Sequence, residues 1–146
     1  MSTSPQPQPG AEPAAPQAQV FRFHELPDLP KGKAHVRLAQ TDLLRGKVQV
    51  LKHGGENNLH AHLRSDGFWF VLAGRARFYT EGDALVADLG PREGVLIPRG
   101  FKYWFEQAGD ETLQILQVHA TMPADDPTDR VAYGEVTEAM RSAVHV

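Results

Sequence analysis

The sequence has 146 residues, a length that suits one domain with a single core. Its hydrophobic share of 41% argues against a wholly disordered chain, and its net charge of −3 does not fit a nucleic-acid-binding protein. The absence of cysteine excludes disulfides, thiolate zinc sites and cysteine nucleophiles. We expect no secretory signal, no transmembrane helix, no nucleic-acid or membrane partner, and a cytoplasmic location.

The first part of the chain, Met1–Gln19, is rich in Pro, Gln and Ala and contains five prolines. Such a segment buries too little apolar surface to offset the entropy lost on ordering. We interpret it as a disordered, solubilising tail. The alternative is a proline-rich ligand for a partner protein.

Short runs rich in Val, Leu, Phe and Tyr follow, separated by Gly, Pro, Asp and Asn. Many short strands at near-regular spacing are typical of an all-β sandwich or barrel. The predicted strands are Ala34–Gln40, Lys47–His53, Leu59–His62, Gly67–Ala73, Arg75–Glu81, Leu85–Asp88, Gly94–Ile97, Tyr103–Glu106 and Thr112–His119.

The last part of the chain changes character. Asp126 followed by Pro127 predicts a helix start. Apolar residues at positions 136, 139, 140 and 143 then repeat with helical spacing. We therefore predict three parts: the tail at 1–19, a β-barrel at 20–122, and a partly helical extension at 123–146.

His60 and His62 are two residues apart on a predicted strand, so both imidazoles lie on one face. Two neutral imidazoles that converge inside a barrel suit a divalent transition metal such as Fe, Mn, Ni or Zn. The alternative is a pair of histidines at a rim with no role, because a His-x-His pair alone is weak evidence.

The surrounding residues resemble the cupin superfamily. Gly54, His60, His62 and Gly74 match the first cupin motif, and Pro98 and Gly100 match the second. The resemblance covers about residues 34–119. It implies a double-stranded β-helix, or jelly-roll barrel, of two antiparallel sheets, here with a short C-terminal helix.

Two positions depart from the motifs. Gly67 stands where the family has a glutamate ligand, and Tyr103 stands where it has its last histidine. A spacer shorter by one residue gives the carboxylate position to Asp66, with a β-bulge to absorb the extra residue before Gly74. Tyr103 either binds the metal or ligand through its hydroxyl, or is a half-buried aromatic residue.

The family register places Gly67, Trp69 and Val71 on the inward face, where Gly67 would leave a void beside the metal. Trp69, Phe105 and Gln117 are then candidate ligand-binding residues, in an apolar pocket with few polar groups. The alternative for each aromatic residue is a place in the barrel core. Gln49 and His119 are further candidates for inward polar groups, whereas other histidines, including His35 and His145, lack ligand spacing.

The resemblance leaves two functions open. The first is a metal-dependent oxygenase or isomerase of a small organic molecule, with Asp66 or Tyr103 completing the site or transferring a proton. The second is a non-catalytic small-molecule-binding or sensing cupin. A sugar isomerase or epimerase would need basic phosphate contacts, and the sequence shows no clear basic pocket. We also expect a homodimer, because Phe68 and Phe70 need cover on the outer face.

Overall fold

Alternating inward and outward side chains between Lys33 and Thr121 form strands that bury one face against an opposing sheet. The computed structural model describes residues 15–24, 26, 32–53 and 56–146. Its strands are β1 (Lys33–Gln40), β2 (Leu44–Leu51), β3 (His60–His62), β4 (Ser65–Ala73), β5 (Arg75–Tyr79), β6 (Leu85–Leu89), β7 (Gly94–Ile97), β8 (Trp104–Ala108), β9 (Leu113–Thr121), β10 (Arg130–Ala132) and β11 (Val144–His145). Each predicted strand overlaps one of these.

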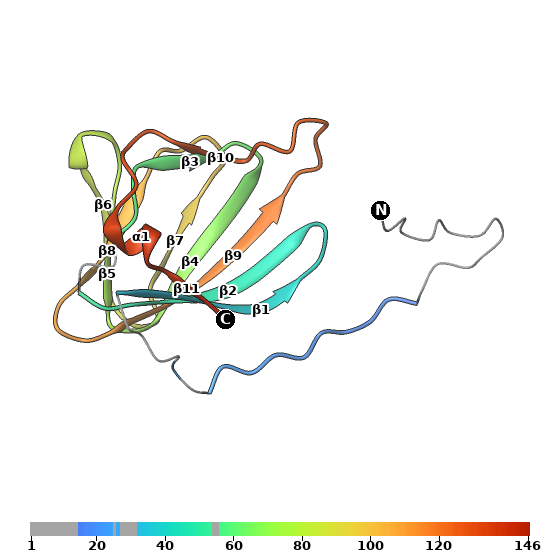
Figure 1. Cartoon of the computed structure of the whole chain (residues 1–146), viewed down its shortest axis with the longest axis horizontal. Coiled ribbons are helices and arrows are strands. Elements are labelled where there is room, and N and C mark those ends of the chain that lie inside the picture. Colours follow the sequence, from blue (N-terminus) through green and yellow to red (C-terminus); the bar gives the residue numbers. More distant parts are fainter. Residues whose placement is uncertain (1–14, 25, 27–31, 54–55) are drawn as a thin grey trace.

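Two layers of strands face each other (Figure 1). One is a six-stranded sheet in the order β11-β1-β2-β9-β4-β7. The other combines the sheet β6-β5-β8 with the pair β10-β3, and a backbone bridge between His60 and Tyr103 joins them. The strands pair antiparallel except β11, which runs parallel to β1. The chain therefore has the predicted all-β, double-stranded β-helix architecture.

The space between the layers has an apolar part and a polar part. Leu51, Val71, Phe78 and Ile115 are fully buried in the apolar part, with Phe105 beside them. This packing holds the two sheets at a fixed separation, and burial of each such side chain stabilises the fold by about 1.5–3 kcal/mol. The polar part of the same space contains the candidate site.

Part of the predicted N-terminal tail lies on the six-stranded sheet. Residues 1–14 fall outside the described residues, and residues 15–19 are exposed. The Gln19 side chain nevertheless forms hydrogen bonds of 2.7 and 2.9 Å with the backbone of Gln40. Phe23 packs against the cluster of Ala34, Val48 and Val50, so this segment covers apolar surface. Figure 1 shows the segment running along β1 and β2.

The predicted helix start at Asp126 is wrong. The segment after Pro127 instead forms β10, which pairs with β3, and the only α-helix of the described residues is the short α1 (Glu138–Arg141). Pairing with β3 satisfies backbone groups that a helix at these positions would have bonded internally. Within the described part of the chain, no helix is long and apolar enough to cross a membrane.

Gly74 provides a test of the turn between β4 and β5. Its φ of +83° is unfavourable for other residues, and a Cβ there would lie 2.7 Å from the Thr112 carbonyl oxygen. We expect Gly74→Ala to lower the free energy of unfolding by about 3 kcal/mol, from backbone strain plus overpacking. Urea denaturation measures this.

Gly109 is the matched control. Its φ is +74°, but a Cβ there would meet no atom within 4 Å. Gly109→Ala should therefore cost only the backbone strain, about 1 kcal/mol. Equal losses for the two variants would contradict the assigned close packing at Gly74.

Candidate metal and ligand pocket

The sheet register brings polar side chains together on the inner face. His119 on β9 lies opposite Arg45 on β2 and Gly67 on β4. Gln117 lies opposite Lys47 and Trp69 in the next inward row. Directly opposed residues point to the same side of a sheet, so these side chains line the space below β3.

His60 is oriented by the backbone. It is buried, and its Nδ1 lies 2.7 Å from the carbonyl oxygen of Asn58. A carbonyl only accepts, so Nδ1 carries the proton and Nε2 keeps a free lone pair. Burial, followed by the nearby positive charge of Arg130, lowers the pKa of His60 to about 3, so the ring stays neutral.

His62 is oriented by a carboxylate. Its Nδ1 lies 2.9 Å from Oδ2 of Asp129. Burial lowers the pKa of His62, although the hydrogen bond to Asp129 acts in the opposite direction. A neutral His62 therefore also keeps a free Nε2. A carboxylate behind a histidine is the usual support of a metal-binding imidazole.

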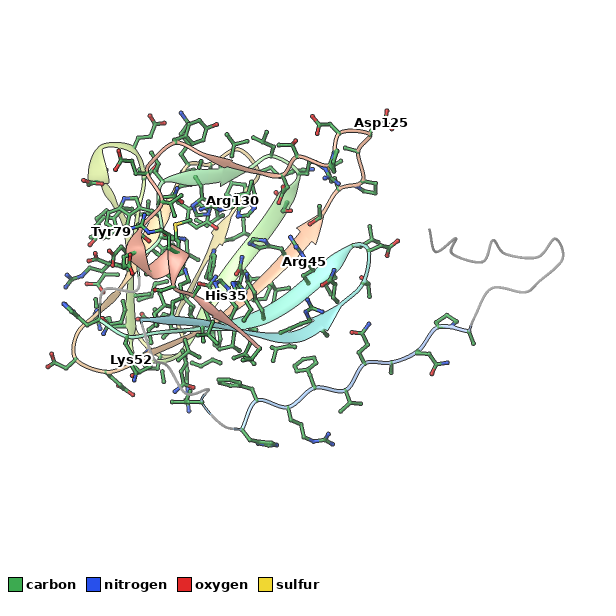
Figure 2. The ribbon with its side chains drawn as sticks, viewed as in Figure 1. His35, Arg45, Lys52, Tyr79, Asp125 and Arg130 are labelled. Carbon is green, nitrogen blue, oxygen red and sulfur yellow. The ribbon has the colours of Figure 1, made fainter. Side chains whose placement is uncertain are left out.

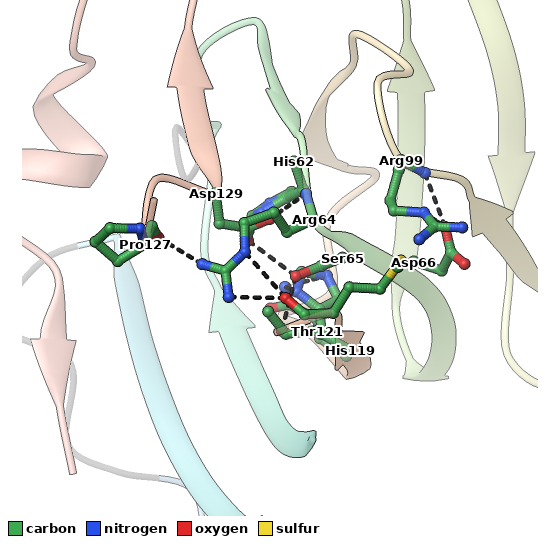
Figure 3. A network of polar contacts seen from close by, with 11 residues as sticks. His62, Arg64, Ser65, Asp66, Arg99, His119, Thr121, Pro127 and Asp129 are labelled. Atoms are coloured by element: carbon green, nitrogen blue, oxygen red, sulfur yellow. Dashed lines mark hydrogen bonds and ion pairs between the residues drawn. The ribbon is translucent and has the colours of Figure 1, made fainter. Parts of the chain in front are cut away.

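Asp129 is itself tightly held (Figure 3). Its carboxylate accepts hydrogen bonds from His62, from the backbone N–H of Arg64 at 2.8 Å and from the Ser65 hydroxyl at 2.9 Å. Burial raises its pKa, but these hydrogen bonds outweigh burial, so the pKa of Asp129 is lowered and it stays ionised. Nothing in the sequence spacing indicated this residue, because 67 positions separate it from His62.

Arg64 fixes the segment that carries Asp129. Its guanidinium donates to the carbonyl oxygen of Met122 at 2.7 and 3.0 Å and to that of Pro127 at 2.7 Å (Figure 3). The chain between these two residues is thereby held against β4. Arg64 thereby stabilises the position of Asp129.

His119 occupies the space that Gly67 leaves open. A Cβ at Gly67 would lie 2.1 Å from Cδ2 of His119 and 2.6 Å from its Nε2. The expected void beside the histidines is therefore filled, and only glycine at position 67 permits it. The ring centroids of His119 and His62 are 4.7 Å apart. Burial, then the neighbouring His62, lowers the pKa of His119 to about 3.

A chain of amides holds His119 in place. Nε2 of Gln117 lies 2.8 Å from Nε2 of His119, and Oε1 of Gln117 accepts from Gln49 at 2.9 Å. Nε2 of His119 is therefore hydrogen-bonded to Gln117 and is not free to bind a metal in this arrangement. Among the described residues, no group of three or more His, Cys, Asp or Glu side chains is positioned to hold a metal ion.

Asp66 does not join the histidines. Side chains alternate along β4, so Ser65 and Gly67 point inward and Asp66 points outward. Its carboxylate accepts from the backbone N–H of Arg99 at 2.9 Å. The β-bulge expected before Gly74 is present after Val71, too far along the strand to turn Asp66 inward.

A cavity of about 200 Å³ lies beside His60 and His62. Tyr103, Trp69 and Gln49 line it, and each is at least 95% buried. The Tyr103 hydroxyl, the Trp69 indole N–H and Oε1 of Gln49 have no hydrogen-bond partner within the described residues. Burial raises the pKa of Tyr103, which keeps its hydroxyl protonated. Such groups are costly to bury unless a bound molecule satisfies them.

The other predicted ligand-binding residues divide between pocket and core. Gln117 lines this cavity and a larger one of about 550 Å³. Phe105 lines neither; it packs 4.8 Å from Trp69, ring to ring, in the core. His35 and His145, which lack ligand spacing, stack at 4.6 Å in the wall of both cavities. The pocket is thus more polar than the aromatic residues alone predicted.

The lowered pKa values of His60 and His119 predict an acid-sensitive fold. Their ordinary value is 6.5 and the folded value is about 3, so the unfolded chain binds more protons between these pH values. The free energy of unfolding should fall as pH drops through this window, by up to about 1.4 kcal/mol per pH unit for each histidine. Urea denaturation with EDTA at about pH 7, 6 and 5 measures the slope.

His119→Gln isolates one of these contributions. Glutamine keeps a polar group at the site and cannot titrate there. The slope of the free energy of unfolding against pH should therefore fall by up to about 1.4 kcal/mol per pH unit, the contribution of one proton. An unchanged slope would show that His119 is not buried as a neutral ring.

The model of the Cupin domain family matches residues 47–119, half of the chain. No curated protein matches the sequence. Among solved structures, a conserved protein with a double-stranded β-helix domain from Klebsiella pneumoniae has a TM-score of 0.63 at 15% identity, over 75% of this chain and 86% of that chain. KdgF from Halomonas sp. has a TM-score of 0.62 at 19% identity, over 75% and 98%.

The DMSP lyase DddQ from Ruegeria pomeroyi has a TM-score of 0.56 at 23% identity, over 79% of this chain and 61% of the lyase. These identities are low, so the likeness concerns the fold. The matched segment contains His60, His62 and His119, with all of β3 and most of β9. The chain belongs to the cupin family.

Proposed function

We propose that this cupin binds a small organic molecule next to a divalent transition metal that is bound by His60, His62 and His119. The observation that carries the proposal is the orientation of His60 and His62: each donates from Nδ1, to Asn58 and to Asp129, and leaves Nε2 free. The donor set is neutral imidazole, which suits Fe, Mn, Ni or Zn.

The ring separations support a common centre. The ring centroids are 5.2 Å apart for His60 and His62 and 4.7 Å apart for His62 and His119. Imidazoles bound through Nε2 at about 2.1 Å to one metal have centroids about 5 Å apart. Binding by His119 requires its ring to turn away from Gln117, to which its Nε2 is hydrogen-bonded here. Within the described chain, no three such side chains are already positioned around one metal ion.

A divalent metal with few protein ligands supplies a Lewis acid with open positions, which suits oxygenase or isomerase chemistry. The role proposed for Tyr103 is that of a hydrogen-bond donor. Its raised pKa disfavours a phenolate, so direct metal binding by Tyr103 is the weaker alternative. The buried hydroxyl would donate to an oxygen of the bound molecule or supply a proton to it.

The second candidate is a non-catalytic binding or sensing cupin. Its support is that His119 is bonded to Gln117 in this arrangement and that no metal group is ready-made among the described residues. The polar groups of Tyr103, Trp69 and Gln49 would then serve to bind a ligand without turnover. Metal content separates the two functions.

We expect the purified, untagged protein to hold up to one metal ion per chain after incubation with Fe²⁺, Mn²⁺, Ni²⁺ or Zn²⁺. His60→Ala combined with His62→Ala should abolish binding, and His119→Gln should lower occupancy, because two imidazoles alone bind a divalent ion weakly. Elemental analysis by mass spectrometry measures occupancy. A wild-type protein that takes up none of these metals rejects the metal-dependent function in favour of the binding module.

Two matched controls sharpen this test. Asp66→Asn removes a carboxylate that points outward, so occupancy should stay at the wild-type level. Gly67→Ala should displace His119 and lower occupancy, whereas Gly46→Ala, where a Cβ meets no atom within 4 Å, should not. If Asp66→Asn lost its metal, the hypothesis that Asp66 is a metal ligand would stand again.

We also propose a homodimer formed through the outer face of the six-stranded sheet. Phe68 and Leu96 are directly opposed there and are 43% and 66% exposed, with Leu72 on the same face. A second copy would cover this apolar surface. We expect a dimer by light scattering at micromolar concentration and a monomer for Phe68→Lys; a monomeric wild type would contradict the proposal.

A further inference from the structure

Positively charged side chains surround the larger of the two cavities, which forms the mouth of the pocket; the smaller one is the inner cavity. Arg37 from β1, Arg45 and Lys47 from β2, and Arg130 from β10 line the cavity of about 550 Å³. Arg37 and Lys47 are directly opposed in the register. In Figure 2, Arg130 lies on the β3–β10 side of this space, and Arg45 lies on the β1–β2 side. The expectation that the chain has no basic pocket is therefore wrong.

These cations have no carboxylate partners among the described residues. The outer surface differs, because Arg75, Arg77, Arg99 and Lys102 form ion pairs with Asp88, Asp66 or Glu81. The only acidic side chain among the described residues that line the pocket is Asp129, and it already accepts three hydrogen bonds. Those donors are neutral, so Asp129 keeps its negative charge, and one carboxylate faces the four cations Arg37, Arg45, Lys47 and Arg130. The positive charge of the pocket is therefore only partly compensated.

Burial makes this arrangement costly. Lys33, 3% exposed, lines the inner cavity, and Lys47 is half-buried between the two cavities. Burial, then neighbouring positive charges, lowers the pKa of Lys33 to about 7 and that of Lys47 to about 8. Glu56 acts in the opposite direction on Lys33, and a bound anion would add further negative charge and remove more of this cost.

The inner end of the pocket carries the second, independent feature. The Tyr103 hydroxyl is a buried donor with no acceptor in the described chain, and the buried Trp69 indole N–H, which faces the Tyr103 oxygen, has no other partner there. Both lie in the inner cavity, which shares Lys47, Gln117 and Arg130 with the outer one. A molecule that reaches from the mouth to these donors would satisfy charge at one end and hydrogen bonds at the other.

We propose that the ligand of this pocket is a small organic acid. Arg37, Arg45 and Lys47 bind its carboxylate or phosphate group at the mouth, and its other end reaches Tyr103 and Trp69. This inference rests on the proposed function, since it names the class of molecule that occupies the same pocket. It adds a negatively charged group to the small organic molecule expected from the sequence.

The test uses isothermal titration calorimetry of the full chain with benzoate, phenyl phosphate and the uncharged analogue benzamide. The anions should bind at least about tenfold more tightly than benzamide, because charge-assisted hydrogen bonds are the stronger ones. Tighter binding of benzoate identifies a carboxylate site, and tighter binding of phenyl phosphate identifies a phosphate site. Raising NaCl from about 0.05 to 0.5 M should weaken binding of the anions but not of benzamide.

Variants locate the anion site. Arg45→Gln combined with Lys47→Gln should weaken anion binding by at least about tenfold. Arg77→Gln removes the same kind of charge from the outer surface and should leave binding unchanged. Equal binding of benzoate, phenyl phosphate and benzamide by the wild-type protein, or unchanged anion binding in the Arg45/Lys47 variant, overturns the proposal.

Titrations of EDTA-treated and metal-loaded protein separate this inference from the metal site. If the protein takes up no metal but binds the anions in a way that depends on Lys47, the organic-acid ligand is supported and the metal site is rejected. If the protein takes up metal but binds the anions no more tightly than benzamide, the metal site is supported and the organic-acid ligand is rejected. The Arg45/Lys47 variant should keep its metal, because neither residue belongs to the proposed donor set.

Discussion

The close approach of His119 to the backbone of Gly67 determines which side chains surround the pocket. Any Cβ at position 67 would overlap the imidazole, so His119 can take this position only when residue 67 is glycine. With His119 in that space, Gln117 contacts its ring and Gln49 contacts Gln117. The inner face of β9 and β2 is therefore polar, and the cations of β1 and β2 line a cavity together with the neutral rings of His62 and His119.

The fold was predictable because its signals are local. Alternation along β4 was correctly read from the sequence, and Gly74 adopts the positive φ that its turn requires. Asp66 was the natural candidate for the missing carboxylate, but a shift of one residue along a strand moves a side chain to the other face. The same alternation that identified the strand therefore keeps Asp66 out of the pocket.

The rest of the site depends on pairings between distant parts of the chain. Asp129 reaches His62 because β10 pairs with β3, and Arg45 faces the pocket because β2 begins three residues earlier than predicted. The sequence near Pro127 carries a local helix-start signal, and strand pairing overrides it. Such contacts leave no spacing pattern, so residues as important as Asp129 and Arg130 could not be identified from the sequence.

Net charge describes the outer surface of this molecule better than its pocket. The chain carries a net charge of −3. Among the described residues, acidic side chains on the outer surface form ion pairs with Arg75, Arg77, Arg99, Lys102 and Arg141. At the mouth, Arg37, Arg45 and Lys47 project from neighbouring strands into one concave space, where their fields add. Arg37 and Arg45 are exposed there, and Lys47 is half-buried. An acidic protein can therefore attract an anion at one place. The physical reason is that the strands place several cations on the inner face, where Asp129 is the one acidic side chain among the described residues that line the cavity.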